Sequence, residues 1–231
     1  VSTKAEGGRF TVTIPQGTPP GMVDVRAIGT YGMSSPRSFF IGHRTERLEA
    51  EPHDTIQSPE QIPLDGVVNG RIEKPGDVDC YRFTAKAGQR VVMECWAERI
   101  DSQLRGVIEV YDARGNRLAA NRGYSGLDPL VDFLVPADGA YAVKLFDLTF
   151  SGSATHFYRL DIDTGPRVEF AVPCVLQQGR TTRVTLFGRN LVAGPGPSPH
   201  QAESRSSNWA APFDRIELDV TPPSGTPNRM G

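Results

Sequence analysis

The sequence lacks the features of a membrane-spanning or polyanion-binding protein. No apolar run approaches the ~18 residues of a membrane span. The 231 residues carry 25 Lys and Arg against 27 Asp and Glu, a formal net charge of −2. Nucleic acids and acidic membrane surfaces attract an excess of positive charge, so we expect neither as a partner. Phosphate-binding glycine loops and nucleic-acid motifs are absent too.

Cysteine is scarce, with three residues at Cys80, Cys95 and Cys174. An odd number leaves at least one thiol unpaired within the chain, and the spacing matches no zinc motif. Strand alternation predicts that Cys80 faces outward and Cys95 faces inward. We therefore expect Cys80 and Cys95 to act as small side chains that fill strand positions. A disulfide between Cys80 and Cys95 is the less favoured alternative.

Recognisable catalytic motifs are also missing. Residues 163–165 spell the aspartic-protease tripeptide Asp-Thr-Gly, but that chemistry needs two such carboxylates and there is one copy. Residues 123–126 lack the glycine spacing of a nucleophile elbow, and none of the four histidines forms His-Glu-x-x-His. No catalytic residue is predicted. An enzyme whose site cannot be read from linear motifs is kept as a separate hypothesis.

Turn-forming residues are abundant, with 24 Gly and 19 Pro. Their share exceeds the usual ~12%, which favours many turns and short strands. No segment keeps a 3.6-residue period, whereas alternation typical of strands recurs through the middle of the chain. Strands are expected at 66–73, 79–85, 89–98, 106–112, 117–121, 130–135, 139–147 and 156–163. The pattern predicts an all-β sandwich or jelly roll.

Turn chemistry predicts how these strands connect. Residues 112–116 and 136–139 are each expected to close a β-hairpin. Residues 76–83 and 89–98 are expected to form the arms of another hairpin, with Asp77 and Asp79 at its mouth. Paired carboxylates at a strand end are either solvated turn formers or ligands of a hard cation.

Short strands are expected at both ends of the chain as well. They are predicted at 9–14, 22–28 and 38–41, and again at 168–172, 182–187 and 213–220. Between the first group and the sandwich, residues 43–63 are polar and contain three prolines. We expect an acidic linker there, with room for one helical turn. Residues 194–207, rich in Pro, Gly and Ser, are expected to form a loop.

Several motifs of the middle region agree in order and spacing with a known family. They are Glu51-Pro52-His53-Asp54-Thr55, Gly70-Arg71-Ile72, residues 76–83, 86–89, 111–116 and 136–141. On these motifs, residues 46–163 resemble the bacterial pre-peptidase C-terminal (PPC) domain. Two positions depart from the pattern, since His53 stands where the family usually has Asn and Cys80 where Tyr is common.

The resemblance implies a non-catalytic accessory module of a secreted, periplasmic or cell-surface bacterial protein. Many members follow protease domains, so the parent protein could be a secreted peptidase or other hydrolase. Because the chain begins at Val1 without Met, we expect a piece of a longer precursor. The implied partners are other domains of the same polypeptide and an extracellular protein or polysaccharide.

The resemblance also implies a calcium site, because a related module in clostridial collagenases binds collagen and calcium. In those relatives an acidic connector folds against the strand mouth and shares a cation with it. The positions that correspond here are Glu49, Glu51, Asp54, Asp77 and Asp79. Ca²⁺ takes six to eight oxygens and disfavours the nitrogen that His53 brings. The alternative is that these are solvated turn carboxylates.

Aromatic residues predict a second candidate site. Trp96 is expected on the outward face of its strand with Val92 and Glu94, and Tyr124 lies in the loop at 121–127. Such side chains can stack on sugar rings or hold a peptide. The favoured alternative is that Trp96 covers a seam to a neighbouring domain.

The terminal strands resemble parts of immunoglobulin-like domains of the IPT/TIG type. The resemblance rests on the strand pattern of 21–41 and on residues 183–191 (Arg-Val-Thr-Leu-Phe-Gly-Arg-Asn-Leu). The expected organisation is Ig-like strands at 1–42, a linker at 43–63, a PPC-like sandwich at 64–165 and Ig-like strands at 166–231. The two ends either pack together as one sandwich or each need strands from outside this chain.

Overall fold

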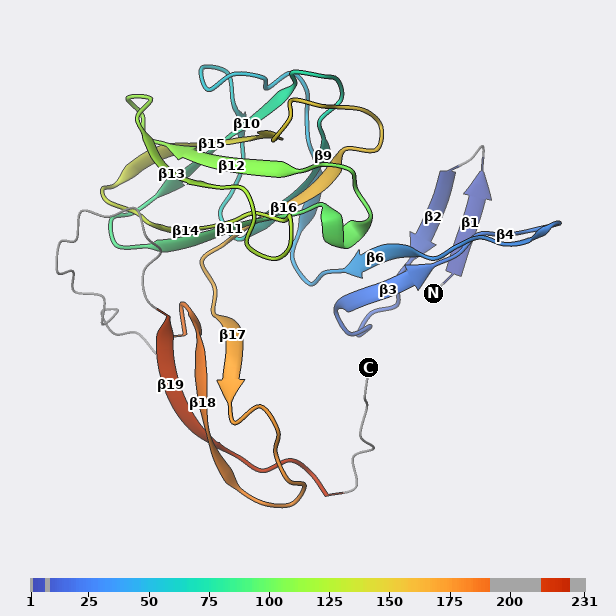
Figure 1. The fold of residues 1–231 in the computed structure, drawn as a ribbon, viewed down its shortest axis with the longest axis vertical. Coiled ribbons are helices and arrows are strands. Elements are labelled where there is room, and N and C mark those ends of the chain that lie inside the picture. Colours follow the sequence, from blue (N-terminus) through green and yellow to red (C-terminus); the bar gives the residue numbers. More distant parts are fainter. Residues whose placement is uncertain (1, 7–8, 192–212, 225–231) are drawn as a thin grey trace.

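The structure is a computed structural model that describes residues 2–6, 9–191 and 213–224. Its centre is a sandwich of two five-stranded sheets (Figure 1). The first has the order β13 (Arg117–Asn121), β12 (Gly106–Tyr111), β15 (Gly139–Asp147), β10 (Val78–Ala85) and β8 (Glu60–Gln61). The second has the order β14 (Leu130–Leu134), β11 (Arg90–Trp96), β16 (Phe157–Asp163), β9 (Gly66–Arg71) and β7 (Glu46–Leu48). The predicted all-β fold is confirmed.

One apolar core lies between the two sheets. Successive residues of a strand point to opposite faces, so alternate side chains of each strand enter it. Tyr81 and Phe83 of β10 and Val91 and Met93 of β11 are fully buried there. Burying an apolar side chain of this size contributes about 1.5–3 kcal/mol, so this core is the main source of stability for the middle of the chain.

The connection between β10 and β11 is not the predicted hairpin. β10 pairs with β15 and β8, whereas β11 pairs with β14 and β16, so the turn at 86–89 crosses between the sheets. The turn at 136–139 crosses as well, because β14 and β15 lie in different sheets. Both hairpin predictions are wrong, while residues 112–116 close the hairpin of β12 and β13 as predicted. Turn residues mark a reversal, but the packing of apolar faces decides which sheet the chain enters.

Residues 43–63 lie against the sandwich. The structure describes this whole segment and shows no helical turn in it. It contributes two short parallel edge strands, β7 beside β9 and β8 beside β10. Arg44 also forms ion pairs with Asp161 and Asp163 of β16. The segment therefore completes the edges of both sheets.

The three cysteines all lie among the described residues and are free. Cys95 is buried in the core as predicted, and Cys174 is exposed. Cys80, predicted to face outward, is fully buried. It points away from the core, as alternation requires, but its amide donates to the His53 carbonyl at 2.9 Å. Cys80 thus faces outward from the core as predicted, and it is buried because the connector lies along this part of β10.

Separate small sheets form the two ends of the chain. At the N-terminal end, β1 (Ser2–Glu6) pairs with β2 (Arg9–Thr13), β3 (Gly21–Val25) with β6 (Arg37–Ile41), and β4 (Ile28–Gly29) with β5 (Gly32–Met33). The C-terminal sheet has the order β17 (Arg167–Val172), β18 (Thr182–Arg189) and β19 (Asp214–Val220). Among the described strands no pairing joins the two ends, so they share no sheet. The predicted loop at 194–207 lies outside the described residues.

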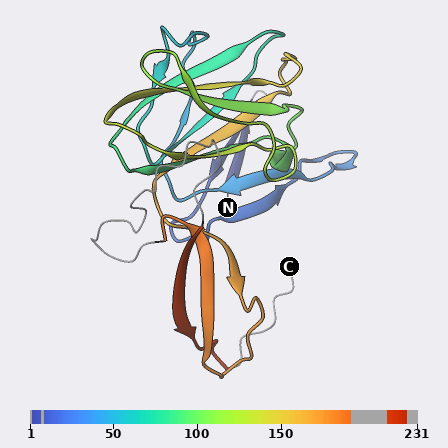
Figure 2. The same ribbon diagram turned by 60° about the vertical axis from the view of Figure 1, so that its left-hand side comes forward.

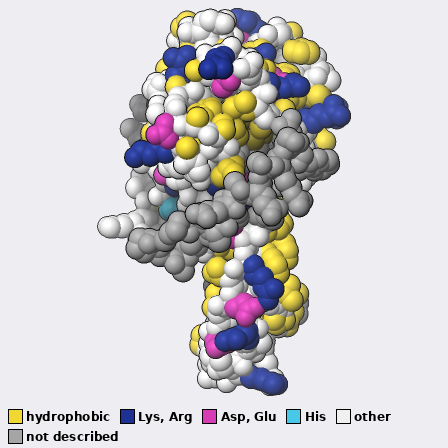
Figure 3. All heavy atoms as spheres, turned by 90° about the vertical axis from the view of Figure 1, so that its left-hand side faces the viewer, with side chains coloured by type: hydrophobic (Ala, Val, Ile, Leu, Met, Phe, Trp, Pro, Cys, Tyr) yellow, Lys and Arg dark blue, Asp and Glu magenta, His cyan; other side chains and the backbone are white. Residues whose placement is uncertain are grey.

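The ends also differ in how they lie relative to the sandwich. The C-terminal sheet extends away from it, whereas β6 passes close to η1 (Glu98–Ile100), a single 3₁₀ turn (Figures 1 and 2). Charged and apolar side chains both gather along the projecting sheet (Figure 3). Within the described residues, no helix has the length and apolar character that crossing a membrane requires.

Candidate cation site

Four side chains with metal-ligating atoms converge where the connector meets β10. They are Glu49, Glu51, His53 and Asp79, and one ligand atom from each lies within 4.8 Å of the others. Backbone hydrogen bonds hold the connector there. The Glu49 amide donates to the Asn69 carbonyl (3.0 Å), and the carbonyl of His53 accepts from β10 (2.9 Å). The structure thus brings together three of the five predicted ligands.

The other two predicted ligands do not join this cluster. Asp77 is buried, and its Oδ2 accepts a hydrogen bond from the Glu73 amide (2.6 Å), so it closes the turn before β10. Asp77 lies two residues before Asp79 on an extended segment, which separates the two backbone positions by ~6.6 Å. This separation keeps Asp77 apart from the cluster around Asp79. Asp54 is exposed.

Two residues of the site are not among the predicted ligands. In the sequence His53 is a departure from the family pattern and is not predicted as a ligand. Its position between the acidic residues Glu51 and Asp54 was the signal that could have identified it as one. Glu60 carried no such signal. Its Oε2 accepts from the Ala50 amide (3.0 Å) and lies 3.9 Å from His53 Nε2.

Two buried polar atoms of the cluster have no hydrogen-bond partner among the described residues. These are His53 Nε2 and Asp79 Oδ1. The residues are 1% and 0% exposed, so bulk solvent does not reach these atoms. An unpaired buried polar group costs about 1–3 kcal/mol. A cation at this place would give both atoms favourable interactions.

Tyrosine hydroxyls extend the cluster into the core. The Tyr158 hydroxyl contacts Asp79 Oδ2, Glu49 Oε2 (2.9 Å) and the Tyr81 hydroxyl, which also lies 3.3 Å from Glu49 Oε2. Two hydroxyls supply two protons to these four contacts, so the hydroxyls alone cannot satisfy all of them. Burial raises the pKa of Asp79 to about 8, against the lowering effect of the Tyr158 hydrogen bond. Burial also raises the pKa of Glu49.

The two aromatic residues predicted to bind a ligand lie at seams of the molecule. The half-buried Trp96 ring is 4.8 Å from the ring of Phe40 in β6, and the Arg99 guanidinium lies 4.3 Å from the Trp96 centroid. Tyr124 is 45% exposed, and its hydroxyl accepts from Arg189 of β18 (3.0 Å). Trp96 therefore faces the N-terminal strands and Tyr124 the C-terminal sheet. Their ligand-binding role stays a prediction.

Residues 77–147 match the family described as the bacterial pre-peptidase C-terminal domain, PPC. Over these residues the central sandwich is similar to a PPC domain. The match includes β10 with Asp79, whereas the connector that carries Glu49, Glu51 and His53 precedes it.

One much longer curated protein and several solved structures are similar to part of this chain. A protein of Deinococcus radiodurans described as a probable subtilase-type serine protease is 33% identical over 98 residues. The alignment covers 41% of this chain and 14% of that relative. Among solved structures, the PPC domain of a Bacillus anthracis collagenase shares 14% identity, covering 50% of this chain and all of that one, with a TM-score of 0.39. Aeromonas hydrophila PliG, a periplasmic inhibitor of g-type lysozyme, shares 16% identity over 52% of this chain and 100% of its own, with a TM-score of 0.35.

Proposed function

We propose that this protein is a non-catalytic accessory module of a secreted, periplasmic or cell-surface bacterial multidomain protein. The PPC match of residues 77–147 carries the proposal. The similarity to a protein described as a probable serine protease supports the proposal that the parent protein is a secreted hydrolase. In this proposal the flanking strands belong to Ig-like domains of the IPT/TIG type, and the sandwich sets their spacing.

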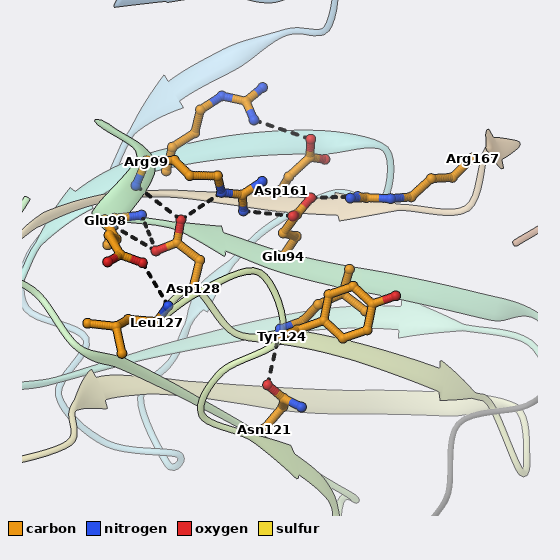
Figure 4. A network of polar contacts seen from close by, with 12 residues as sticks. Glu94, Glu98, Arg99, Asn121, Tyr124, Leu127, Asp128, Asp161 and Arg167 are labelled. Atoms are coloured by element: carbon orange, nitrogen blue, oxygen red, sulfur yellow. Dashed lines mark hydrogen bonds and ion pairs between the residues drawn. The ribbon is translucent and has the colours of Figure 1, made fainter. Parts of the chain in front are cut away.

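Two polar seams support a spacing role. On the N-terminal side, the Ser38 amide of β6 donates to Asp101 Oδ2 (3.0 Å). On the C-terminal side, Arg167 pairs with Glu94 of β11 at 2.5 Å, and Glu94 also pairs with Arg99 at 2.7 Å (Figure 4). Separating a buried ion pair inside a protein is strongly unfavourable. The ion pairs of the buried Glu94 therefore hold β17 against the sandwich, and an exposed hydrogen bond adds a contact on the N-terminal side.

A proteolysis assay tests the non-catalytic part of this proposal. The purified chain is incubated with casein and with gelatin, and new amino groups are measured over time. We expect no release above a buffer blank. Release in proportion to the concentration of the chain, and retained through a second purification step, would reject the proposal.

A second function is favoured by the convergence of Glu49 and Glu51 on Asp79. We propose that a divalent cation binds there, calcium being the cation that the sequence predicts, and supports binding of an extracellular protein or polysaccharide. A ligand that binds the native state raises stability by mass action. The test compares the melting midpoint in excess chelator with that in millimolar Ca²⁺. An upward shift supports calcium, and an unchanged midpoint excludes it.

A further inference from the structure

We propose that this cluster binds a divalent transition cation of the Zn²⁺ class in preference to Ca²⁺, through His53 Nε2 and the carboxylates of Glu49 and Glu51. The inference rests on the second function proposed above, because it names the cation for the same site. It follows from the position of the imidazole among the carboxylates.

His53 Nε2 lies almost equally far from three carboxylates. Its distances to Glu49 Oε2, Glu51 Oε1 and Glu60 Oε2 are 3.7, 3.8 and 3.9 Å. These separations are too long for hydrogen bonds. Two ligand atoms of a tetrahedral Zn²⁺ at ~2.1 Å lie ~3.4 Å apart. The nitrogen and these oxygens are about 0.3–0.5 Å wider than that, so small side-chain rotations would let one cation bridge them.

Ca²⁺ suits this arrangement less well. It needs six to eight oxygen ligands at about 2.3–2.6 Å and has little affinity for nitrogen. Here a nitrogen occupies the middle of the group, and Asp77, a predicted oxygen donor, is bonded to the Glu73 amide instead. Imidazole nitrogen is a good ligand for Zn²⁺ and related transition cations. The donor set thus favours a transition cation.

The ring proton of His53 also has a place to go. Nε2 can bind a metal only when the single proton of the neutral ring is on Nδ1. Asp79 Oδ1, buried and without a partner among the described residues, lies 4.0 Å from Nδ1. This separation is too long for a hydrogen bond in the metal-free protein, so Asp79 would orient the metal-bound imidazole only after Nδ1 moves about 1 Å closer. In the structure Nδ1 accepts a hydrogen bond from the Cys80 amide (3.2 Å), which places the proton of the neutral ring on Nε2. Metal binding at Nε2 would therefore move the proton to Nδ1, and the Cys80 amide would keep the His53 carbonyl as its acceptor.

Calorimetric titration of the whole chain, freed of metal by a chelator, tests the preference with Zn²⁺ and Ca²⁺ as titrants. A Cys174→Ser background removes the exposed thiol, which could bind Zn²⁺ by itself. We expect one Zn²⁺ per chain and at least tenfold weaker binding of Ca²⁺. His53→Asn exchanges the nitrogen for an amide oxygen. It is expected to weaken Zn²⁺ at least tenfold and to strengthen Ca²⁺.

His43→Asn is the matched control, because His43 is exposed and outside the cluster. It should leave both affinities unchanged. If His53→Asn does not fold, Glu51→Gln replaces it, since the Glu51 side chain is 33% exposed and its change should not alter the metal-free melting midpoint. We expect about tenfold weaker Zn²⁺ binding in that variant.

The outcomes separate this inference from the proposal beneath it. Zn²⁺ binding that is unchanged in the cluster variants, or Ca²⁺ binding as tight as Zn²⁺, overturns the preference and leaves a cation site in place. If neither cation binds or raises the melting midpoint, the preference and the second proposed function both fall.

Discussion

Gly70 shows how a single residue shapes the cation cluster. A Cβ at this position would lie 2.1 Å from Glu49 Oε2 and 2.4 Å from the Tyr158 hydroxyl. Glycine in a strand often marks a place where another group approaches the backbone closely. At Gly70 the approaching groups are a carboxylate of the cluster and the hydroxyl that bonds to it. The absence of a side chain therefore lets Glu49 reach Tyr158 and face His53.

Gly70→Ala should displace Glu49 and weaken the cluster. We expect a loss of about 1–3 kcal/mol in the free energy of unfolding, because an added methyl group overpacks the site. Urea unfolding measures this loss, and calorimetry should show weaker cation binding. Gly29→Ala is the matched control, since a Cβ on this strand glycine would meet nothing within 4 Å. Equal effects of the two substitutions would contradict the role given to Gly70.

The segment from β11 to η1 is organised by carboxylates that accept several hydrogen bonds each. Asp128 accepts from the amides of Ala97 (2.9 Å) and Glu98 (2.7 Å), and from Arg99 Nε (2.7 Å) (Figure 4). Glu94 lies between Arg99 and Arg167, the first residue of β17. Burial alone would raise the pKa of Glu94, but the hydrogen bonds and charges of the two arginines lower it below its usual value. The network links β11, η1 and β17 through ionised groups.

Acid should weaken this network. Because the pKa of Glu94 is lower in the folded protein than in the unfolded chain, its contribution is present above the unfolded pKa of ~4.3. The contribution is lost as the pH falls through the folded pKa. We expect Glu94→Gln to be about 2 kcal/mol less stable than the original chain at pH 7 and the difference to shrink below about pH 4.

Urea unfolding at several pH values between 7 and 3 measures this difference. Subtraction of the variant removes the contribution of Asp79, whose raised pKa acts in the opposite direction. A difference that stays constant over the whole range would show that Glu94 acts by packing and not by charge.

At the scale of the whole molecule, Arg189 joins the C-terminal sheet to the sandwich. The Arg189 side chain is 2% exposed and pairs with Asp132 of β14 (2.8 Å) and Glu169 of β17. Its guanidinium also donates to the Tyr124 hydroxyl (3.0 Å) and lies 4.9 Å from the ring centroid of Phe213. The Arg189 guanidinium therefore contacts a strand of the sandwich, a strand of the C-terminal sheet and the loop that carries Tyr124. Its loss removes one of two arginine partners from each carboxylate, because Asp132 also pairs with Arg90 and Glu169 with Arg167.

Arg189→Ala should loosen the C-terminal sheet and leave the sandwich folded. In hydrogen exchange we expect at least tenfold less protection in β17 and β18, with little change in β10 and β15. Arg183→Ala is the matched control on the same strand, because the Arg183 side chain is 68% exposed and its ion pairs are at the surface. Surface pairs contribute at most about 1 kcal/mol. Equal losses of protection in both variants would contradict the role of Arg189.

The sequence by itself determined where most strands lie. The strand predicted at 139–147 has those bounds in the structure, and the one predicted at 79–85 begins a residue earlier. Alternation and turn residues are local signals, and strand formation in this chain follows them closely. The acidic connector and Asp79 could also be selected from the sequence, because a family pattern marks them.

Only the tertiary structure decided which strands share a sheet and which side chains complete the site. Residues 86–89 read as a hairpin turn, yet they join different sheets, because the apolar faces of β10 and β11 pack against each other. The burial of Cys80, and the approach of His53 and Glu60 to Glu49, depend on the connector lying along β10. Local alternation specifies which face of a strand is apolar, but contacts between distant segments specify what covers the other face.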